Sequence, residues 1–235
     1  MSRKFIPCPA AIVHEGEVSV RPRRLTGEEP LTIRVDQREV ATLWRIPGED
    51  IALAKGFLAA SGITAEVLEA CYCSGAVAGV NPYNLLDLTL GAPGEPLSPS
   101  WTPLEVSQLD DAWQQFSKAA GSAKAPYCAA GIDLERAVAA LGCVSMSNAL
   151  DKAAGLRELT PAPIIALNAP VDGELMRRIV AHGAPKVVLS PAPPTAAAAQ
   201  LAADHAVGIA TSPSSAPAPW TVYGDTNAVI PNTTG

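Results

Sequence analysis

The sequence predicts an α/β protein in which a small β-rich N-terminal part precedes a larger C-terminal part built on a largely parallel sheet. Three patterns support this prediction. Apolar and polar residues alternate over residues 31–35 and 84–90, as in strands with one buried face. Residues 106–120 place apolar side chains at spacings of three and four, as in an amphipathic helix. Short apolar runs separated by helical segments then extend over residues 164–210.

The N-terminal part is predicted to contain one helix between strands. Strands are expected at residues 31–35 and 40–44, and the segment Arg45-Ile-Pro-Gly48 ends the extended pattern. A helix is expected over residues 50–61, where Asp50 can cap the first turn and Gly62 can supply a left-handed end. Four apolar residues share one face of this helix: Ile51, Ala54, Phe57 and Leu58.

A proline- and glycine-rich segment, residues 91–102, is predicted to be a loop that joins the two parts. We therefore expect an N-terminal part at residues 1–100 and a C-terminal α/β domain at residues 101–235.

The C-terminal part is predicted to follow a strand–helix–strand–helix–strand order after two initial helices. The helices are expected at residues 106–120, 147–155, 172–182 and 195–205, and the strands at residues 164–167, 187–189 and 207–210. Ligands of parallel sheets bind outside the carboxyl ends of the strands. Here these ends are the small, polar or proline-containing residues 168–170, 190–194 and 211–216.

Composition narrows the possible functions. The 235 residues include 17 Lys and Arg against 23 Asp and Glu, and the resulting formal charge of -6 argues against a broad nucleic-acid interface. No apolar run approaches the roughly 20 residues that span a bilayer, and the first residues do not resemble a secretory signal. We expect a cytoplasmic protein without membrane contact. Its five cysteines, an odd number, are expected to be reduced thiols.

Several segments resemble the FdhD family of accessory sulfur-carrier proteins, which formate dehydrogenases with molybdenum or tungsten require for maturation. The matching segments are Glu28-Glu29-Pro30-Leu31, Pro47-Gly48 with Gly56-Phe57-Leu58, Asn148-Ala149-Leu150-Asp151-Lys152, Pro194-Thr195 and Val222-Tyr223. The resemblance implies a cytidine-deaminase-like α/β domain beside the β-rich part. It also implies three partners: a formate dehydrogenase catalytic subunit, a cysteine desulfurase and a second copy of the chain.

The chain departs from this family where sulfur chemistry takes place. Family members carry sulfur as a persulfide on a Cys-x-x-Cys loop after the strand corresponding to residues 84–90, and here residues 91–108 contain no cysteine. The family's Gly-Arg-His and Ser-Gly-Arg segments are replaced by Ser145-Met146-Ser147 and Asn168-Ala169-Pro170. Side chains suited to proton transfer or phosphate pairing are therefore missing at these positions.

The cysteines have competing interpretations. Cys71 and Cys73 would share one face of a strand and could form a metal or redox pair, but we interpret them as two small buried side chains. Cys128, expected in a loop near Lys124, is the best remaining sulfur carrier, and Cys143 could approach the same pocket.

The other polar residues have simple structural interpretations. His182 and His205 are expected to interact with helix C-termini, and adjacent Asp151 and Lys152 to be solvated charges. The resemblance to the FdhD family favours a further role for Asn148 and Asp151. The zinc-deaminase signature and the common phosphate-binding glycine motifs are absent from the sequence, and no metal site is predicted.

These observations favour an accessory protein that binds the molybdopterin guanine dinucleotide cofactor, as Mo-bis(molybdopterin guanine dinucleotide), and presents it to apo formate dehydrogenase without carrying sulfur. The predicted cofactor-binding residues are Asn148, Asp151, Asn168, Ser190, Thr195, Thr211, Ser212, Ser214 and Ser215. Backbone N–H groups and hydroxyls there could meet a pyrophosphate without arginine. The second hypothesis is an active sulfurtransferase that uses Cys128 or Cys143. The third is a partner-binding scaffold that has lost both activities.

Overall fold

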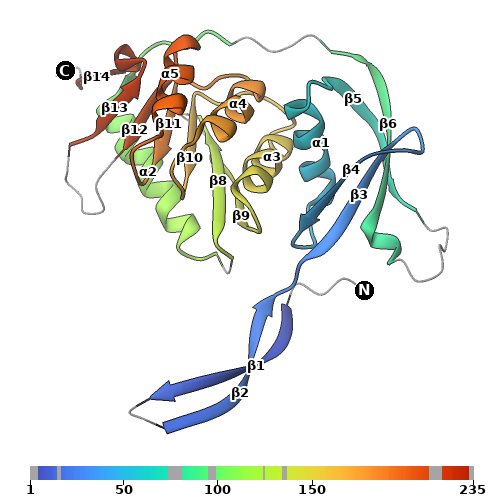
Figure 1. Ribbon diagram of the computed structural model, residues 1–235. Coiled ribbons are helices and arrows are strands. Elements are labelled where there is room, and N and C mark those ends of the chain that lie inside the picture. The colour runs from blue at the N-terminus through green and yellow to red at the C-terminus, as the bar shows by residue number, and fades with distance from the viewer. Residues whose placement is uncertain are drawn as a thin grey trace. The chain divides into compact units, whose positions relative to one another are not determined.

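The computed structural model describes residues 5–14, 17–73, 81–94, 99–123, 125–133, 137–211 and 219–232 (Figure 1). The chain divides into two compact units, Met1–Gly48 with Glu69–Thr89 and Glu49–Leu68 with Leu90–Gly235. This division differs from the single boundary expected at residue 100, because the helix that begins at Asp50 groups with the C-terminal residues. None of the helices in the described residues has the length and hydropathy that a membrane span requires.

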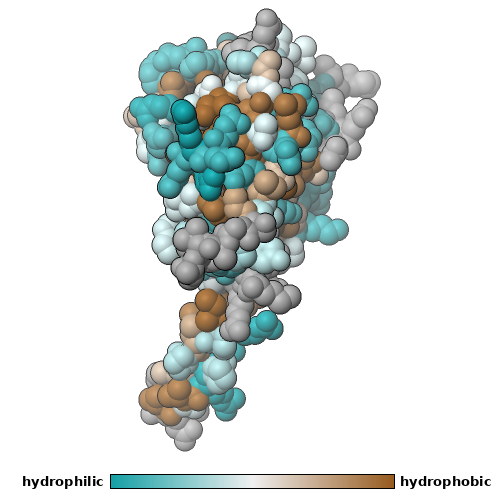
Figure 2. All heavy atoms as spheres, turned by 90° about the vertical axis from the view of Figure 1, so that its right-hand side faces the viewer, coloured by the Kyte–Doolittle hydropathy of each residue, from teal (hydrophilic) through white to brown (hydrophobic). Residues whose placement is uncertain are grey.

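The first unit begins with an antiparallel hairpin that the sequence patterns did not predict. Strand β1 (Phe5–His14) pairs with β2 (Glu17–Thr26), and Pro9 faces Pro22 in the register. Prolines are unusual in strand interiors, which hides the strand signal in the sequence. The hairpin carries exposed apolar side chains, Val18 and Val20 among them, and brown spheres gather near its lower end in Figure 2.

A four-stranded sheet follows in the order β4-β3-β6-β5. Its strands are β3 (Glu29–Val35), β4 (Arg38–Arg45), β5 (Ala65–Tyr72) and β6 (Leu85–Pro93), with the short 3-10 helix η1 (Pro82–Asn84) before β6. β3 pairs antiparallel with β4 and parallel with β6. Leu31, Ile33, Leu86 and Leu88 are buried on one face of this sheet, as the predicted alternation requires.

The second unit is built on a six-stranded sheet in the order β13-β12-β11-β10-β8-β9. Its strands are β8 (Tyr127–Ile132), β9 (Ala137–Cys143), β10 (Ile164–Leu167), β11 (Val187–Ser190), β12 (Gly208–Thr211) and β13 (Thr221–Gly224). The neighbours β10, β11 and β12 are parallel, whereas β8, β9 and β13 pair antiparallel. The predicted α/β class is confirmed, and the parallel part is the centre of a mixed sheet.

Helices cover both faces of this sheet (Figure 1). On one face, α3 (Met146–Leu156), α4 (Gly173–Ala181) and α5 (Ala196–Asp204) bury apolar residues such as Leu150, Met176 and Ala202. On the other face, α2 (Val106–Ala120) buries Leu109 and Phe116. A short parallel pair, β7 (Leu104–Glu105) with β14 (Val229–Ile230), and the 3-10 helix η2 (Thr226–Ala228) complete the unit.

Helix α1 (Asp50–Ala60) packs against α3 within the second unit. Gly62, with φ of 82°, follows the helix in the left-handed conformation that was expected. The expected cap was wrong, because Glu49 occupies the N-cap position with φ of 55° and Asp50 is the first helical residue.

Candidate functional site

The carboxyl ends of β10, β11 and β12 meet at one edge of the six-stranded sheet. Ala166 is in register with Leu189, and Ser190 with Thr211, so Asn168, Ser190 and Thr211 lie along the same edge. The antiparallel strand β8 begins at this edge and β9 ends there, because Ala129 pairs with Leu167 and Cys143 with Tyr127. The topology therefore places three predicted site residues, together with Cys128 and Cys143, at one edge of the sheet.

Three helices begin at this edge, because α3 follows β9, α4 follows β10 and α5 follows β11. The first turn of each is capped by a side-chain oxygen. Ser145 accepts from the Asn148 N–H at 3.1 Å, Asp172 from the Leu175 N–H at 2.8 Å, and Thr195 from the Ala198 N–H at 3.3 Å. The positive ends of three helix dipoles thus face the edge.

The three helix starts differ in charge. The first turn of α4 carries Glu174 in addition to the carboxylate cap Asp172, whereas α3 and α5 have neutral caps and no acidic residue in the first turn. Neither α3 nor α5 therefore has a carboxylate at its cap or in its own first turn, and these two starts are more favourable places for an anion than the start of α4.

The predicted side chains at the edge bond within the protein. Asn168 accepts the Cys128 N–H at 2.8 Å and donates to the Pro126 carbonyl at 2.7 Å, which ties β10 to the start of β8. The Ser190 hydroxyl lies 3.1 Å from the Ala169 carbonyl and 2.9 Å from the Ala192 carbonyl. The Thr211 hydroxyl donates to the Thr221 carbonyl at 3.4 Å. Together these bonds shape the loops of the edge. Ser212, Ser214 and Ser215 lie outside the described residues.

Asp151 lies inside the protein and not at the edge. Its side chain is completely buried and binds Arg178 through two hydrogen bonds of 2.6 Å. His182 Nε2 lies 2.9 Å from the same carboxylate. The hydrogen bond to Asp151 raises the pKa of Arg178, although burial opposes this shift. Asp151 therefore joins α3 to α4, and the expectation of a solvated charge was wrong.

The contacts of Arg178 and His182 with Asp151 were not predicted from the sequence. His182 is the C-cap of α4, as the helix-end interpretation suggested, but its ring contacts a carboxylate that lies 31 positions earlier in the chain. Arg178 also lies over the ring of Phe57, at 5.8 Å from its centroid. Spacing in the sequence gave no signal for either contact, because each depends on how α1, α3 and α4 pack together. Asn148, by contrast, lies in the first turn of α3, close to the edge.

The thiols of Cys128 and Cys143 are not accessible to solvent. Cys128 is fully buried within β8, so the expectation that it lies in a loop was wrong. Cys143 is 2% exposed, and burial raises its pKa, with a smaller opposite effect from the positive charge of Lys152. Thiolates are the attacking species in sulfur transfer, so this environment disfavours reaction at Cys143.

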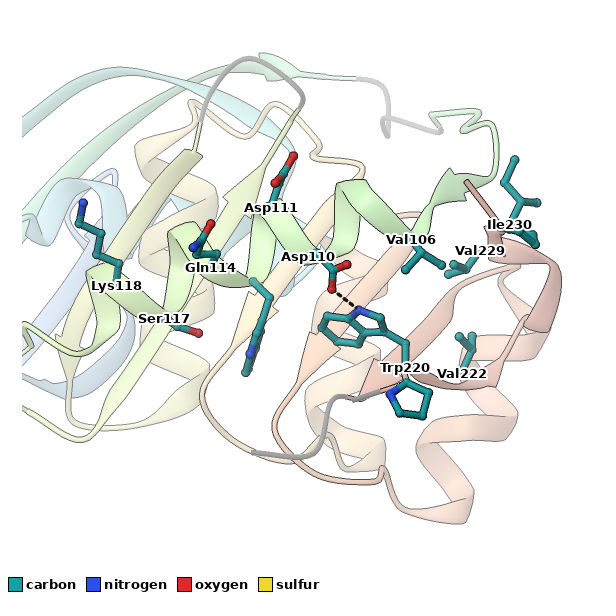
Figure 3. Close-up of a pocket in the computed structure, with 13 residues that line it drawn as sticks. Val106, Asp110, Asp111, Gln114, Ser117, Lys118, Trp220, Val222, Val229 and Ile230 are labelled. Atoms are coloured by element: carbon teal, nitrogen blue, oxygen red, sulfur yellow. Dashed lines mark hydrogen bonds between the residues drawn. The ribbon is translucent and has the colours of Figure 1, made fainter. Parts of the chain in front are cut away.

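A groove of about 1150 Å³ lies on the α2 side of the sheet, between α2, β13 and β14 (Figure 3). Trp113 and Trp220 line it with ring centroids 6.2 Å apart, and Trp220 Nε1 donates to Asp110 at 2.8 Å. Trp220 precedes Thr221, which pairs with Thr211, so the groove begins beside the carboxyl edge. Sequence patterns did not predict this groove, because its lining comes from segments about 110 positions apart.

Comparisons with known proteins agree with the resemblance read from the sequence. No family model matches the chain. Curated proteins named sulfur carrier protein FdhD match locally. The protein of Streptomyces coelicolor is 45% identical over 86 residues, which cover 35% of this chain and 30% of that protein. The protein of Mycobacterium bovis is 44% identical over 85 residues, or 33% and 30% of the two chains. The matched stretch thus spans about a third of these relatives.

The fold has a counterpart among solved structures. A crystal structure from Desulfotalea psychrophila, described as a formate dehydrogenase accessory protein, superposes with a TM-score of 0.76. The superposition covers 97% of this chain and 100% of that one at 15% identity, which establishes a shared fold. The FdhD resemblance predicted from the sequence is confirmed by the curated relatives, and the predicted fold class by this structure.

Proposed function

We propose that this chain, as a homologue of the FdhD proteins, is a formate dehydrogenase accessory protein that holds the molybdopterin guanine dinucleotide cofactor and delivers it to the apoenzyme. In this proposal the chain does not carry sulfur. The observation that carries the proposal is the sheet edge at which α3, α4 and α5 begin.

The charge distribution at the edge favours a pyrophosphate. Each uncompensated helix N-terminus stabilises an anion by about 0.3–1 kcal/mol, and by up to about 2 kcal/mol where the site is partly buried. The start of α5 is the one nearer to Trp220, because β11 lies closer than β9 to β13 in the sheet, and a diphosphate there can accept hydrogen bonds from backbone N–H groups. This arrangement supplies positive potential without the arginines that the family resemblance led us to expect.

The groove beside the edge suits the other half of such a ligand. Guanine and pterin are flat heterocycles that stack on aromatic side chains, and Trp220 lies where the groove meets the edge. A dinucleotide with its pyrophosphate at the edge could therefore place a ring against the indole.

The cofactor proposal is tested by purifying the chain from a molybdenum-competent host. We expect pterin fluorescence to co-purify with the wild-type protein, and the Trp220→Leu variant to retain several-fold less. Asp204→Asn, which alters an exposed residue of α5, is the matched control and should retain the wild-type amount. Wild-type protein without any bound pterin would contradict the proposal and favour the scaffold hypothesis.

Sulfur loading separates the proposal from the sulfurtransferase hypothesis. After incubation with a cysteine desulfurase and cysteine, peptide mass mapping should show no stable added sulfur on Cys128 or Cys143, because both thiols are buried. A persulfide that disappears in the Cys128→Ser or Cys143→Ser variant would overturn this part of the proposal. Formate dehydrogenase activation with the same samples shows whether sulfur matters to the client.

A further inference from the structure

Cys71 and Cys73 form an accessible pair in the first unit. Cys71, on β5, is exposed, and Cys73 follows the strand with its N–H bonded to the Leu85 carbonyl at 3.1 Å. The interpretation as two buried side chains was therefore wrong. Residues two apart on a strand have Cα atoms about 6.6 Å apart and side chains on the same side, which leaves their Cβ atoms farther apart than the roughly 4 Å of a disulfide. Because β5 ends at Tyr72, Cys73 lies just beyond the strand, and ring closure requires its backbone to move towards Cys71.

A carboxylate and a guanidinium adjoin the pair. The Cys73 thiol donates to Asp87 Oδ2, and the other carboxylate oxygen lies 2.9 Å from Arg34 Nε. Arg34 on β3 and Asp87 on β6 are register partners, so the three side chains form a row across neighbouring strands. The hydrogen bond to Asp87 is the main reason that the pKa of Cys73 is raised, followed by burial and the negative charge of Asp87. Cys73 therefore keeps its proton while Cys71 faces the solvent.

We propose that Cys71 and Cys73 form a dithiol site that exchanges with small disulfides, with Asp87 accepting the proton of Cys73. The Cys71 thiolate attacks one sulfur of a disulfide R–S–S–R, forms a mixed disulfide and releases one thiolate R–S⁻. The Cys73 sulfur then attacks Cys71 Sγ as its proton passes to Asp87, and the second R–S⁻ leaves. In sum, the dithiol loses two electrons and the external disulfide is reduced to two thiols.

Cys71 and Cys73 have different roles in this exchange. The exposed thiol meets the incoming disulfide, and the thiol bonded to a carboxylate closes the ring. Arg34 lies beside this carboxylate as its ion-pair partner. This site lies in the first unit and does not use the cofactor-binding edge, so either proposal can fail without the other.

Peptide mass mapping can report the redox state of Cys71 and Cys73, because both lie in one tryptic peptide. No lysine or arginine occurs between Lys55 and Lys118, so trypsin releases residues 56–118 as one peptide, and its cysteines are Cys71 and Cys73. The reduced full chain is incubated with oxidised glutathione, quenched with acid, denatured, alkylated with N-ethylmaleimide and digested. We expect this peptide to lose two hydrogens and escape alkylation, while buried Cys128 and Cys143 are alkylated. A peptide with two alkyl groups or two glutathiones would overturn the proposal.

Variants assign the two roles. Cys73→Ser should stop at a glutathione adduct on Cys71. Asp87→Asn should accumulate the same adduct and close at least about tenfold more slowly, because a general base typically contributes a factor of 10² or more. Asp36→Asn, at an exposed position between β3 and β4, is the matched control and should close at the wild-type rate. Closure of Asp87→Asn at the wild-type rate would contradict the role of Asp87, and ring closure in Cys73→Ser would contradict the pairing.

Discussion

Replacing Asp151 with asparagine should lower the free energy of unfolding by about 3–5 kcal/mol, because one partner of a buried ion pair is removed. Asp151 is completely buried, and the Arg178 side chain is only 20% exposed. In the variant the guanidinium would remain in the protein without its carboxylate. Urea unfolding followed by circular dichroism measures the loss.

Two further variants make this test specific. Glu174→Gln removes an ion pair with Arg177 in which both side chains are largely exposed, and it should cost less than about 1 kcal/mol. Adding Arg178→Met to Asp151→Asn should cost much less than the sum of the single changes, because the two residues share one interaction. A loss below about 1 kcal/mol for Asp151→Asn, or strict additivity with Arg178→Met, would refute the structural role of Asp151.

The second large effect is expected at the contact between α1 and α3. A Cβ atom at Gly56 would lie 1.9 Å from the Asp151 carbonyl oxygen, and one at Gly155 would lie 1.9 Å from the Ala52 carbonyl oxygen. Backbone atoms cannot move aside as a flexible side chain can, so the helices must separate. Gly56→Ala and Gly155→Ala should each reduce the free energy of unfolding by about 3 kcal/mol, as for severe overpacking.

Gly173→Ala is the matched control for these substitutions. Gly173 is the first residue of α4, and a Cβ there would meet only the Ala197 Cβ at an ordinary 3.4 Å. Alanine is the better helix former, so this variant should be neutral or stabilised by up to about 1 kcal/mol. Equal stability for Gly56→Ala and the wild type in urea would show that α1 and α3 do not pack this closely.

The sequence predicted elements whose signal is local. Helix α2 covers the predicted residues 106–120, because its apolar spacing and its end at Gly121 lie within the helix itself. Helix α1 and the strands β3, β10, β11 and β12 also lie where the patterns placed them, within a few residues.

Strand β8 shows why other elements were missed. Its Cys-Ala-Ala-Gly sequence has little strand propensity, yet the strand needs small residues. A Cβ at Gly131 would lie 2.5 Å from Arg157 Cδ, so the close approach of that side chain selects glycine. Such a requirement comes from tertiary packing, and local patterns do not contain it. The misplacement of Cys128 in a loop has the same cause.

The candidate site was predictable in position but not in the role of each side chain. The carboxyl edge follows from the order of strands and helices, which the sequence reveals. The inward position of Asp151 does not follow, because its partners Arg178 and His182 are 27 and 31 positions away. The hydroxyls of Ser190 and Thr211 likewise find their carbonyl partners only in the folded chain.

If the start of α5 binds a diphosphate, the chain should bind guanosine diphosphate in a calorimetric titration. The design uses the N-cap Thr195, because aspartate caps a helix as well as threonine but adds a negative charge at the proposed anion site. We predict saturable binding by the wild type and by Thr195→Ser. Thr195→Asp should bind about tenfold more weakly, corresponding to about 1.4 kcal/mol. Absence of binding by the wild type, or equal affinity in Thr195→Asp, would show that the start of α5 does not bind a diphosphate.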